Sequence, residues 1–347
     1  MSPRRCAFID IGTNTILCLI VELRDTGQFR VLDDLAEIPR LGEGVDQTKR
    51  IGAAGERRST EVIEGYLSQC RNLDVEEIIA VGTSALRDAR NSGEVRARLN
   101  ARLGFEIRVI SGDEEAAYSF LSVQRGLPLE GRELLVIDVG GGSTEFIRGN
   151  DSGMAEALSV DLGAVRLTER LLRSDPVKPE EYDGMVALID RELAPLRERW
   201  RKSGSSLTLR LKPRPRPGPF AQDSAPRADW KVPRVGPWGF TLVGIAGTFT
   251  TLAAVEKKLT RYSHSEVHGS RLTLPEVRRQ ARLFLDKTIA ERKEIPGLEP
   301  KRADVILSGA CLIERIMTFF HAEEVIVSDQ GVRYGLLYEQ LSRAKLL

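Results

Sequence analysis

One short pattern occurs twice in this 347-residue chain and restricts what the chain can fold into. An apolar run ends in Asp10, passes through a turn with glycine and hydroxyl side chains, and continues into a second β-branched run. The same order of residues returns around Asp138, 128 residues later. Such runs predict β-strands joined by a tight turn. Two copies at this separation predict an internal duplication of one domain-sized unit.

Strand-like and helix-like spacings alternate along the chain, which predicts a mixed α/β layer structure. The expected strands are Cys6–Ile11, Ile16–Leu23, Phe29–Leu35, Glu77–Val81, Glu106–Ile110, Leu134–Val139 with a strand after its turn, Thr241–Ile245 and Val325–Ser328. The expected helices are Arg58–Leu73, a pair within Ser84–Leu103, Asp113–Arg125, Ala164–Leu172, Pro179–Arg201, Thr248–Leu259, Leu274–Phe284, Lys301–Phe320 and Gly331–Ala344.

Charge is balanced overall but concentrated in one segment. The chain has 51 Lys and Arg against 50 Asp and Glu, yet residues 201–240 carry nine basic and two acidic residues and seven of the sixteen prolines. The overall balance argues against a DNA-binding or membrane-surface protein. The segment has too little apolar periodicity to pack, so we expect an insertion there. It would be either disordered or a guide for polyanions.

Cysteine usage and the apolar stretches bear on the compartment. The four cysteines lie far apart without a C-x-x-C motif, which predicts neither a disulfide framework nor a zinc site and favours a reducing cytoplasm. Asp10 interrupts the first apolar stretch, which argues against a signal peptide. The uncharged run Val235–Val255 is rich in glycine and favours a strand, a turn and a helix over a membrane span.

The repeated turn has two interpretations. Glycines let backbone N–H groups approach an anion, and an Asp at the strand end can supply a hard oxygen ligand for Mg²⁺. Alone, Asp10 would be an ordinary hairpin Asp. Because a second turn follows Asp138 with three glycines and Ser143, we favour a phosphate and metal site. Glu145 shares a strand face with Ser143 and is either a further metal ligand or a solvated strand residue.

Two carboxylates open the helix after the strand Glu106–Ile110. Ser111 and Glu114 have capping-box spacing, so Glu114 has a structural role. Glu115 has none and is a candidate general base, or else a carboxylate that favours the helix dipole.

Two strand-to-helix turns carry hydroxyl groups, Gly82–Arg87 and Gly244–Thr250. Each is either an anion site, with Arg87 as a phosphate ligand in the first, or a helix cap made by Ser or Thr. His264 and His268 lack the glutamate of H-E-x-x-H, and we assign them no metal role.

Together these segments resemble the exopolyphosphatase/guanosine pentaphosphate phosphohydrolase family, within the actin-like ATPase and sugar-kinase superfamily. The matching blocks keep the family's order over nearly the whole chain. They are FIDIGTNT from Phe8, GTSALR from Gly82, VISGDEEA from Val109, VIDVGGGSTE from Val136, DLGAVRLT from Asp161, GIAGTFTTL from Gly244 and SDQGVRYGL from Ser328.

The resemblance implies two ribonuclease-H-like domains with an interdomain cleft. The first would be residues 1–128, joined by a C-terminal helix at about 331–347. The second would be residues 129–330, with the Pro/Arg-rich insertion at about 203–237. The resemblance also implies that Glu115 is catalytic and that Asp10, Asp138 and Glu145 hold Mg²⁺, or Mn²⁺. The implied phosphate-binding residues are Thr13, Asn14, Ser84, Arg87, Gly140, Gly141, Gly142, Ser143, Gly247 and Thr248.

We therefore predict a cytoplasmic hydrolase that releases orthophosphate from the ends of inorganic polyphosphate. The first alternative is a 5′-phosphohydrolase that converts guanosine pentaphosphate to the tetraphosphate. A phosphotransferase or ATPase of the same superfamily and a silent binding protein are further alternatives. Longer members of the family carry an appended C-terminal helical domain that we do not expect here, so processivity on long polyphosphate is left open. A homodimer is expected by family analogy, with no DNA and no membrane partner.

Overall fold

The computed structural model describes residues 4–24, 27–203 and 234–343. They form two compact units, one from the chain up to Gly126 together with the stretch from Gln330, the other from Leu127 to Asp329. Each unit is built on its own sheet, which confirms the predicted α/β fold class. Most of the predicted insertion at 203–237 lies outside the described residues. The predicted cleft between the units stays a prediction.

The first unit has a five-stranded sheet in the order β3-β2-β1-β4-β5. β1 (Arg4–Ile11), β2 (Ile16–Leu23) and β3 (Phe29–Glu37) form an antiparallel meander. β4 (Glu77–Gly82) pairs with β1 in parallel, and β5 (Ile107–Val109) pairs with β4 in parallel. The central strand β1 is therefore the one that ends at the Asp10 turn.

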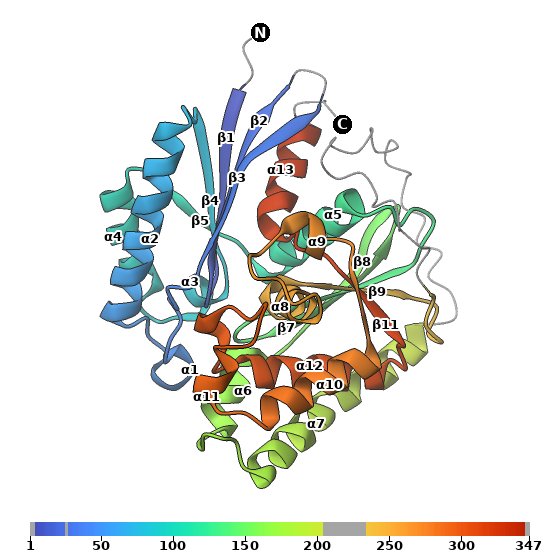
Figure 1. Cartoon of the computed structure of the whole chain (residues 1–347). Helices are drawn as coiled ribbons and strands as arrows, with labels where there is room; N and C mark the ends of the chain where they lie inside the picture. Colours follow the sequence, from blue (N-terminus) through green and yellow to red (C-terminus); the bar gives the residue numbers. More distant parts are fainter. Residues whose placement is uncertain (1–3, 25–26, 204–233, 344–347) are drawn as a thin grey trace. The chain divides into compact units, whose positions relative to one another are not determined.

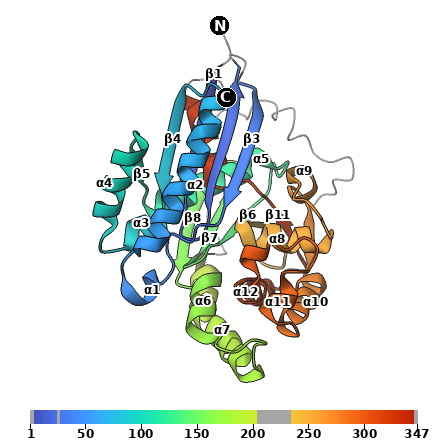
Figure 2. The ribbon, with the colours of Figure 1, turned by 60° about the vertical axis from the view of Figure 1, so that its left-hand side comes forward.

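Helices cover both faces of this sheet. α2 (Ala53–Asn72) and α4 (Ser92–Leu103) lie on one face, and α5 (Gly112–Gly126) and α13 (Val332–Arg343) on the other, as Figures 1 and 2 show. The unit also contains the short helices α1 (Val45–Thr48) and α3 (Ser84–Asp88).

Alternation along β1 places Asp10. Ala7, Ile9 and Ile11 pack with α2 and α4, whereas Cys6 and Phe8 pack with α13. Because successive side chains of a strand point to opposite faces, Asp10 lies on the face that α5 and α13 cover.

The second unit repeats this topology. Its sheet has the order β10-β11-β9-β6-β7-β8, so β8-β7-β6-β9-β11 matches the five strands of the first unit and β10 is an antiparallel addition. The matching order confirms the internal duplication. The strands are β6 (Leu134–Val139), β7 (Thr144–Asn150), β8 (Gly153–Val160), β9 (Thr241–Ile245), β10 (Arg271–Thr273) and β11 (Glu324–Val327).

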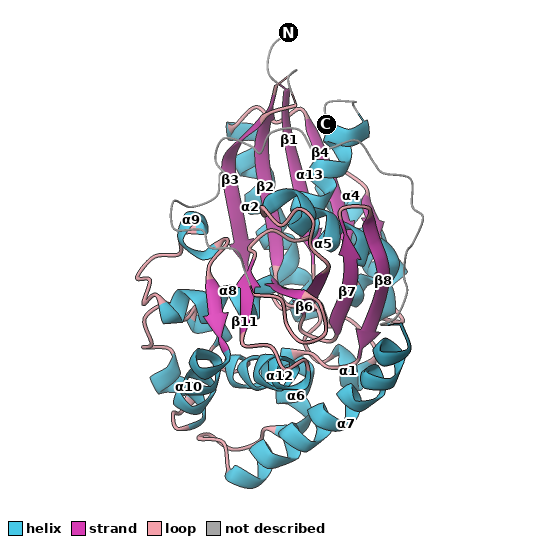
Figure 3. Cartoon of the chain, turned by 90° about the vertical axis from the view of Figure 1, so that its right-hand side faces the viewer, coloured by secondary structure: helices cyan, strands magenta, loops and turns pink. Residues whose placement is uncertain are grey.

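The main core of this unit lies between one face of the sheet and its long helices. Figure 3 shows α7 (Pro179–Ser203), α10 (Leu274–Leu285) and α12 (Ile306–Phe319) on the same side of the strands. Leu135 and Ile137 of β6 are fully buried there. The remaining elements are α6 (Ala164–Leu171), α8 (Ala246–Glu256), α9 (His264–Val267), α11 (Ile289–Arg292) and the 3₁₀ turn Pro300–Arg302.

Several predicted boundaries were wrong. α2 begins at Ala53, five residues early, because Gly55 in its first turn packs against the carbonyl of Leu41. The single helix predicted over Lys301–Phe320 is a 3₁₀ turn followed by α12 from Ile306. α8 begins at Ala246 and ends at Glu256, just before Lys258 adopts a left-handed conformation. The edge strands β8 and β10 were not predicted.

None of the helices in the described ranges combines the length and the apolar composition needed to cross a bilayer.

Candidate active site

The turn after Asp10 is a tight hairpin beside the start of α3. The N–H of Gly12 donates to the carbonyl of Thr15 at 3.1 Å. The Oγ1 of Thr13 donates to the Oγ of Ser84, 3.2 Å away. The structure therefore brings two of the predicted phosphate-binding loops together at the carboxyl ends of β1 and β4.

The segment Arg40–Gly42, for which the sequence predicted no role, binds the backbone of this turn. The N–H groups of Gly42 and Arg40 donate to the carbonyls of Thr13 and Asn14, at 2.8 and 3.1 Å. A side chain at Gly42 would collide with Thr13, because its Cβ would lie 2.3 Å from the Cγ2 of Thr13. Gly42 therefore allows the close approach that holds the hairpin.

Asp10 has an unusual electrostatic environment. Its Oδ1 atom is buried and has no hydrogen-bond partner among the described residues. Burial raises the pKa of Asp10 to about 7, the charge of Glu115 adds to this effect, and Arg333 opposes it. A carboxylate with this pKa is only partly ionised at neutral pH, and a nearby cation would favour its ionised form.

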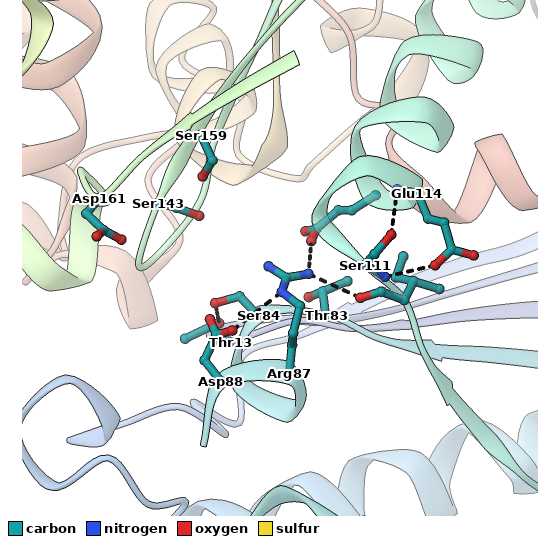
Figure 4. Close-up of polar contacts among 12 residues, drawn as sticks. Thr13, Thr83, Ser84, Arg87, Asp88, Ser111, Glu114, Ser143, Ser159 and Asp161 are labelled. Atoms are coloured by element: carbon teal, nitrogen blue, oxygen red, sulfur yellow. Dashed lines mark hydrogen bonds and ion pairs between the residues drawn. The ribbon is translucent and has the colours of Figure 1, made fainter. Parts of the chain in front are cut away.

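Glu115 contacts the arginine of the first strand-to-helix turn. The Nη1 of Arg87 lies 2.9 Å from the Oε2 of Glu115 and also donates to the carbonyl of Ile110 at 3.2 Å. Figure 4 shows the Arg87 guanidinium with these dashed contacts. The candidate base and a candidate phosphate ligand thus form one ion pair.

The neighbouring carboxylate has the predicted structural role. The N–H of Ser111 donates to Glu114 at 2.9 Å, and the N–H of Glu114 donates to the Oγ of Ser111 at 3.2 Å (Figure 4). This capping box confirms the prediction for Glu114 and leaves Glu115 available for other contacts. Burial raises the pKa of Glu115, although the hydrogen bond and charge of Arg87 oppose the rise.

The second unit carries the equivalent hairpin with one difference. The N–H of Gly140 donates to the carbonyl of Ser143 at 3.0 Å, as Gly12 does to Thr15. Glu145 stands directly opposite Asp138 in the β6–β7 pair, whereas Leu17 occupies that position opposite Asp10. Directly opposed residues lie on one face with Cβ atoms about 5 Å apart. The second unit therefore pairs two carboxylates.

Hydroxyl groups orient Glu145. Ser143 and Ser159 donate to its Oε1 at 2.7 and 2.9 Å, and both serines appear in Figure 4. The predicted placement of Ser143 and Glu145 on one face is confirmed.

The first residues of α6 bind the backbone of the turn Gly140–Gly142. The N–H groups of Ala164 and Val165 donate to the carbonyls of Gly140 and Gly141, each at 3.0 Å. A Cβ at Gly163 would lie 2.3 Å from the carbonyl oxygen of Gly141. This contact gives a structural reason for the glycine in the DLGAVRLT block.

The strand-to-helix turn after β9 lies beside β6, since Ile245 pairs with Asp138. Gly247 and Thr248 form the first turn of α8, and a Cβ at Gly247 would lie 2.3 Å from the guanidinium of Arg302. Arg302 was missed by the sequence analysis because no local pattern connects it to Gly247.

Helix capping by hydroxyl side chains does not explain either turn. The residues at the cap positions, Thr83 for α3 and Ile245 for α8, make no side-chain capping bond. The hydroxyl groups of Thr250 and Thr251 donate instead to the carbonyl of Gly247.

The two histidines bind a buried carboxylate. The Nδ1 atoms of His264 and His268 lie 2.6 and 3.0 Å from the two carboxylate oxygens of Asp329. Although burial alone would raise the pKa of Asp329, these contacts hold it below its usual range. His264 begins the short helix α9, where a loop or strand had been expected, and His268 follows this helix with an extended backbone.

The candidate residues are thus divided between the two units. Asp10, Thr13, Asn14, Ser84, Arg87 and Glu115 belong to the first, and Asp138, Gly140, Gly141, Gly142, Ser143, Glu145, Gly247 and Thr248 to the second. No group of three or more His, Cys, Asp or Glu among the described residues is arranged to hold a metal. The roles of these residues stay predictions.

The protein consists of two α/β units of the same topology. In each unit a central strand has an aspartate, Asp10 or Asp138, as its last residue but one, and a glycine-containing hairpin turn follows the strand. The model of the Ppx/GppA phosphatase family matches residues 19–212 and 233–344, and the chain belongs to this family. The predicted resemblance to this family is confirmed.

Named relatives cover nearly the whole chain. It is 32% identical over 348 residues to exopolyphosphatase 2 of Mycobacterium tuberculosis, covering 97% of this chain and 98% of the relative. A bifunctional 3-dehydroquinate synthase/phosphatase of Fusobacterium nucleatum is 30% identical over 96% of this chain, which spans 46% of that relative. A guanosine-5′-triphosphate,3′-diphosphate pyrophosphatase of Vibrio cholerae is 26% identical over 96% of this chain and 59% of its own length.

A solved structure has the same fold throughout. The crystal structure of an exopolyphosphatase from Cytophaga hutchinsonii superimposes with a TM-score of 0.82 at 26% identity, covering 99% of each chain.

Proposed function

We propose that this chain is a Mg²⁺-dependent exopolyphosphatase that releases orthophosphate from the ends of inorganic polyphosphate. Family membership and the Mycobacterium tuberculosis relative support this proposal. The observation that carries it is the contact between Arg87 and Glu115. It places an anion-binding guanidinium beside a carboxylate that can accept a proton from water.

In the proposed reaction, a water oxygen attacks the terminal phosphorus and the bond from phosphorus to the bridging oxygen breaks. Glu115 takes one proton from the water, and orthophosphate and the shortened chain leave. Phosphoryl transfer passes through a loose, highly charged transition state, so positioned donors supply most of the catalysis. In the first unit the proposed donors are the Thr13 and Ser84 hydroxyls and Arg87. In the second unit they are backbone N–H groups of the Gly140–Gly142 turn.

The carboxylates fit a magnesium ion. Asp10 presents a buried oxygen without a hydrogen-bond partner, and Asp138 faces Glu145 across a strand pair. Mg²⁺ in phosphate-handling enzymes takes one or two carboxylates and completes its shell with phosphate and water oxygens, so a larger cluster is not required. Asp138, Glu145 and Asp10 are the candidate ligands, of which the ion would take one or two. The bound ion would neutralise charge on the phosphate oxygens.

The guanosine pentaphosphate phosphohydrolase is the second candidate, and the Vibrio cholerae relative favours it. An ATPase or phosphotransferase is a further alternative. The proposal also includes a cytoplasmic location, a homodimer and no DNA partner.

Orthophosphate release from polyphosphate, guanosine pentaphosphate and ATP, with Mg²⁺ and with chelator, tests the proposal. We expect polyphosphate to give the highest kcat/KM and the chelator to abolish release. Glu115→Gln should abolish turnover but keep polyphosphate binding, whereas the neighbouring control Glu114→Gln should stay active. Full activity of Glu115→Gln would refute the assignment of the base.

A further inference from the structure

Arg87 makes contacts that compete with the role expected of a phosphate ligand. Its Nη1 holds the Oε2 of Glu115 at 2.9 Å and the carbonyl of Ile110 at 3.2 Å, and its Nε lies 3.5 Å from Asp88. The side chains of Arg87 and Glu115 are 27% and 18% exposed. The pair is therefore shielded but still reachable from solvent.

A carboxylate held by a guanidinium is a weak base. The hydrogen bond from Arg87 occupies an oxygen that would receive the proton, and its charge stabilises the ionised form. Burial acts in the opposite direction and raises the pKa of Glu115. The basicity of Glu115 therefore depends on whether Arg87 stays beside it.

We propose that Arg87 exchanges partners during the reaction, holding Glu115 before substrate binds and moving to the terminal phosphate afterwards. This inference rests on the proposed phosphohydrolase function. A terminal phosphate offers several charged oxygens to a guanidinium, which can bind two of them at once. Both carboxylate oxygens of Glu115 are then free of the guanidinium only when substrate is present.

The charged groups around Glu115 agree with this exchange. Asp88 on α3 raises the pKa of Glu115, and Asp10 on β1 interacts repulsively with it. On its own helix, Glu114 is engaged by Arg108 and by the cap at Ser111. Once Arg87 has moved, these acidic neighbours favour proton uptake by Glu115.

The pH dependence of the two kinetic parameters tests the exchange. The acidic limb of kcat/KM reports the free enzyme and that of kcat reports the substrate complex. We expect the kcat limb of the wild type to lie at higher pH than the kcat/KM limb, at saturating Mg²⁺ and with single-turnover rates used for kcat. In Arg87→Gln, both limbs should coincide at the higher position, and kcat/KM should fall by about 100-fold.

Asp88→Asn is the matched control, because it changes another contact of Arg87. In this variant the acidic limb of kcat should still lie at higher pH than that of kcat/KM. Coincident limbs in the wild type would overturn the proposal, since Arg87 would then stay on Glu115 throughout. That comparison needs no variant, so poor folding of Arg87→Gln would not obscure it. Absence of phosphate release from every substrate would instead refute the proposed function.

Discussion

A Cβ atom at Gly335 would lie 2.2 Å from the carbonyl oxygen of Tyr118. Gly335 belongs to α13, and Tyr118 to α5, where it follows Glu115 by three residues. The two helix backbones therefore touch at a point where no side chain fits. α13 thus limits where α5, and with it the candidate base, can lie.

Gly335→Ala should move α5 and destabilise the first unit. Forcing a methyl group into a filled contact costs about 1–3 kcal/mol, and kcat should fall because Glu115 shifts. Urea unfolding and phosphate release measure the two effects. Gly331→Ala is the control, since a Cβ there would meet no atom within 4 Å. Equal stability of the Gly335 variant and the wild type would contradict the backbone contact.

Asp10→Asn should stabilise the metal-free protein at alkaline pH. The pKa of Asp10 is about 7 in the folded protein, above its ordinary value of 3.8, so the folded state binds more protons between these pH values. The free energy of unfolding of the wild type therefore falls as pH rises from about 4 to 7. At pH 8 without Mg²⁺ the variant should be more stable by roughly 1–3 kcal/mol, and at pH 4 the two should agree. Chemical unfolding of both proteins across this pH range measures the difference. If their free energies of unfolding changed with pH in parallel, the titration of Asp10 would not affect stability.

Gly247→Ala should displace Arg302 without unfolding the protein. The new methyl group would meet the end of a flexible side chain, which can move away at little cost. If Arg302 contributes to phosphate binding, kcat/KM should fall by about tenfold while the unfolding midpoint changes little. Gly184→Ala in α7, where no atom lies within 4 Å of the new Cβ, is the control. Unchanged kinetics would remove Arg302 from the site.

Asp329→Asn should destabilise the second unit at neutral pH. Because the histidine contacts lower the pKa of Asp329, its stabilisation is present above the unfolded-state pKa of about 3.9 and is lost as pH falls below it. We expect a loss of about 1–3 kcal/mol at pH 7 that shrinks below pH 4. Asp286→Asn is the control, since its ion pair with Arg282 is exposed. A constant difference down to pH 3 would show that the charge of Asp329 is not responsible.

The duplicated hairpins were predictable because their signals are local. Apolar alternation, a terminal Asp and adjacent glycines lie within about ten residues of each other around Asp10 and Asp138. The capping box of Ser111 and Glu114 is local in the same way, and it too was predicted correctly.

The contacts that complete the site are not local. Arg87 and Glu115 are 28 residues apart, and only the fold brings them to 2.9 Å. No sequence pattern connects Gly42 with Thr13 of the first hairpin. None connects Arg302 with Gly247 at the start of α8 either. The ends of α2 and α8 were misplaced because tertiary packing at Gly55 and the left-handed Lys258 decide them.

The first unit is assembled from two distant parts of the chain. Arg333 of α13 binds Asp34 of β3 through two hydrogen bonds of 2.8 and 3.0 Å, across 299 residues, and both side chains are buried. During synthesis, the first 126 residues leave the ribosome with α5 but without α13, the other helix on the Asp10 face of their sheet. The second unit precedes α13 in the chain and can fold before that helix exists. An interrupted translation product would therefore leave the apolar side chains that pack on α13, among them Phe8 and Leu19, without that helix.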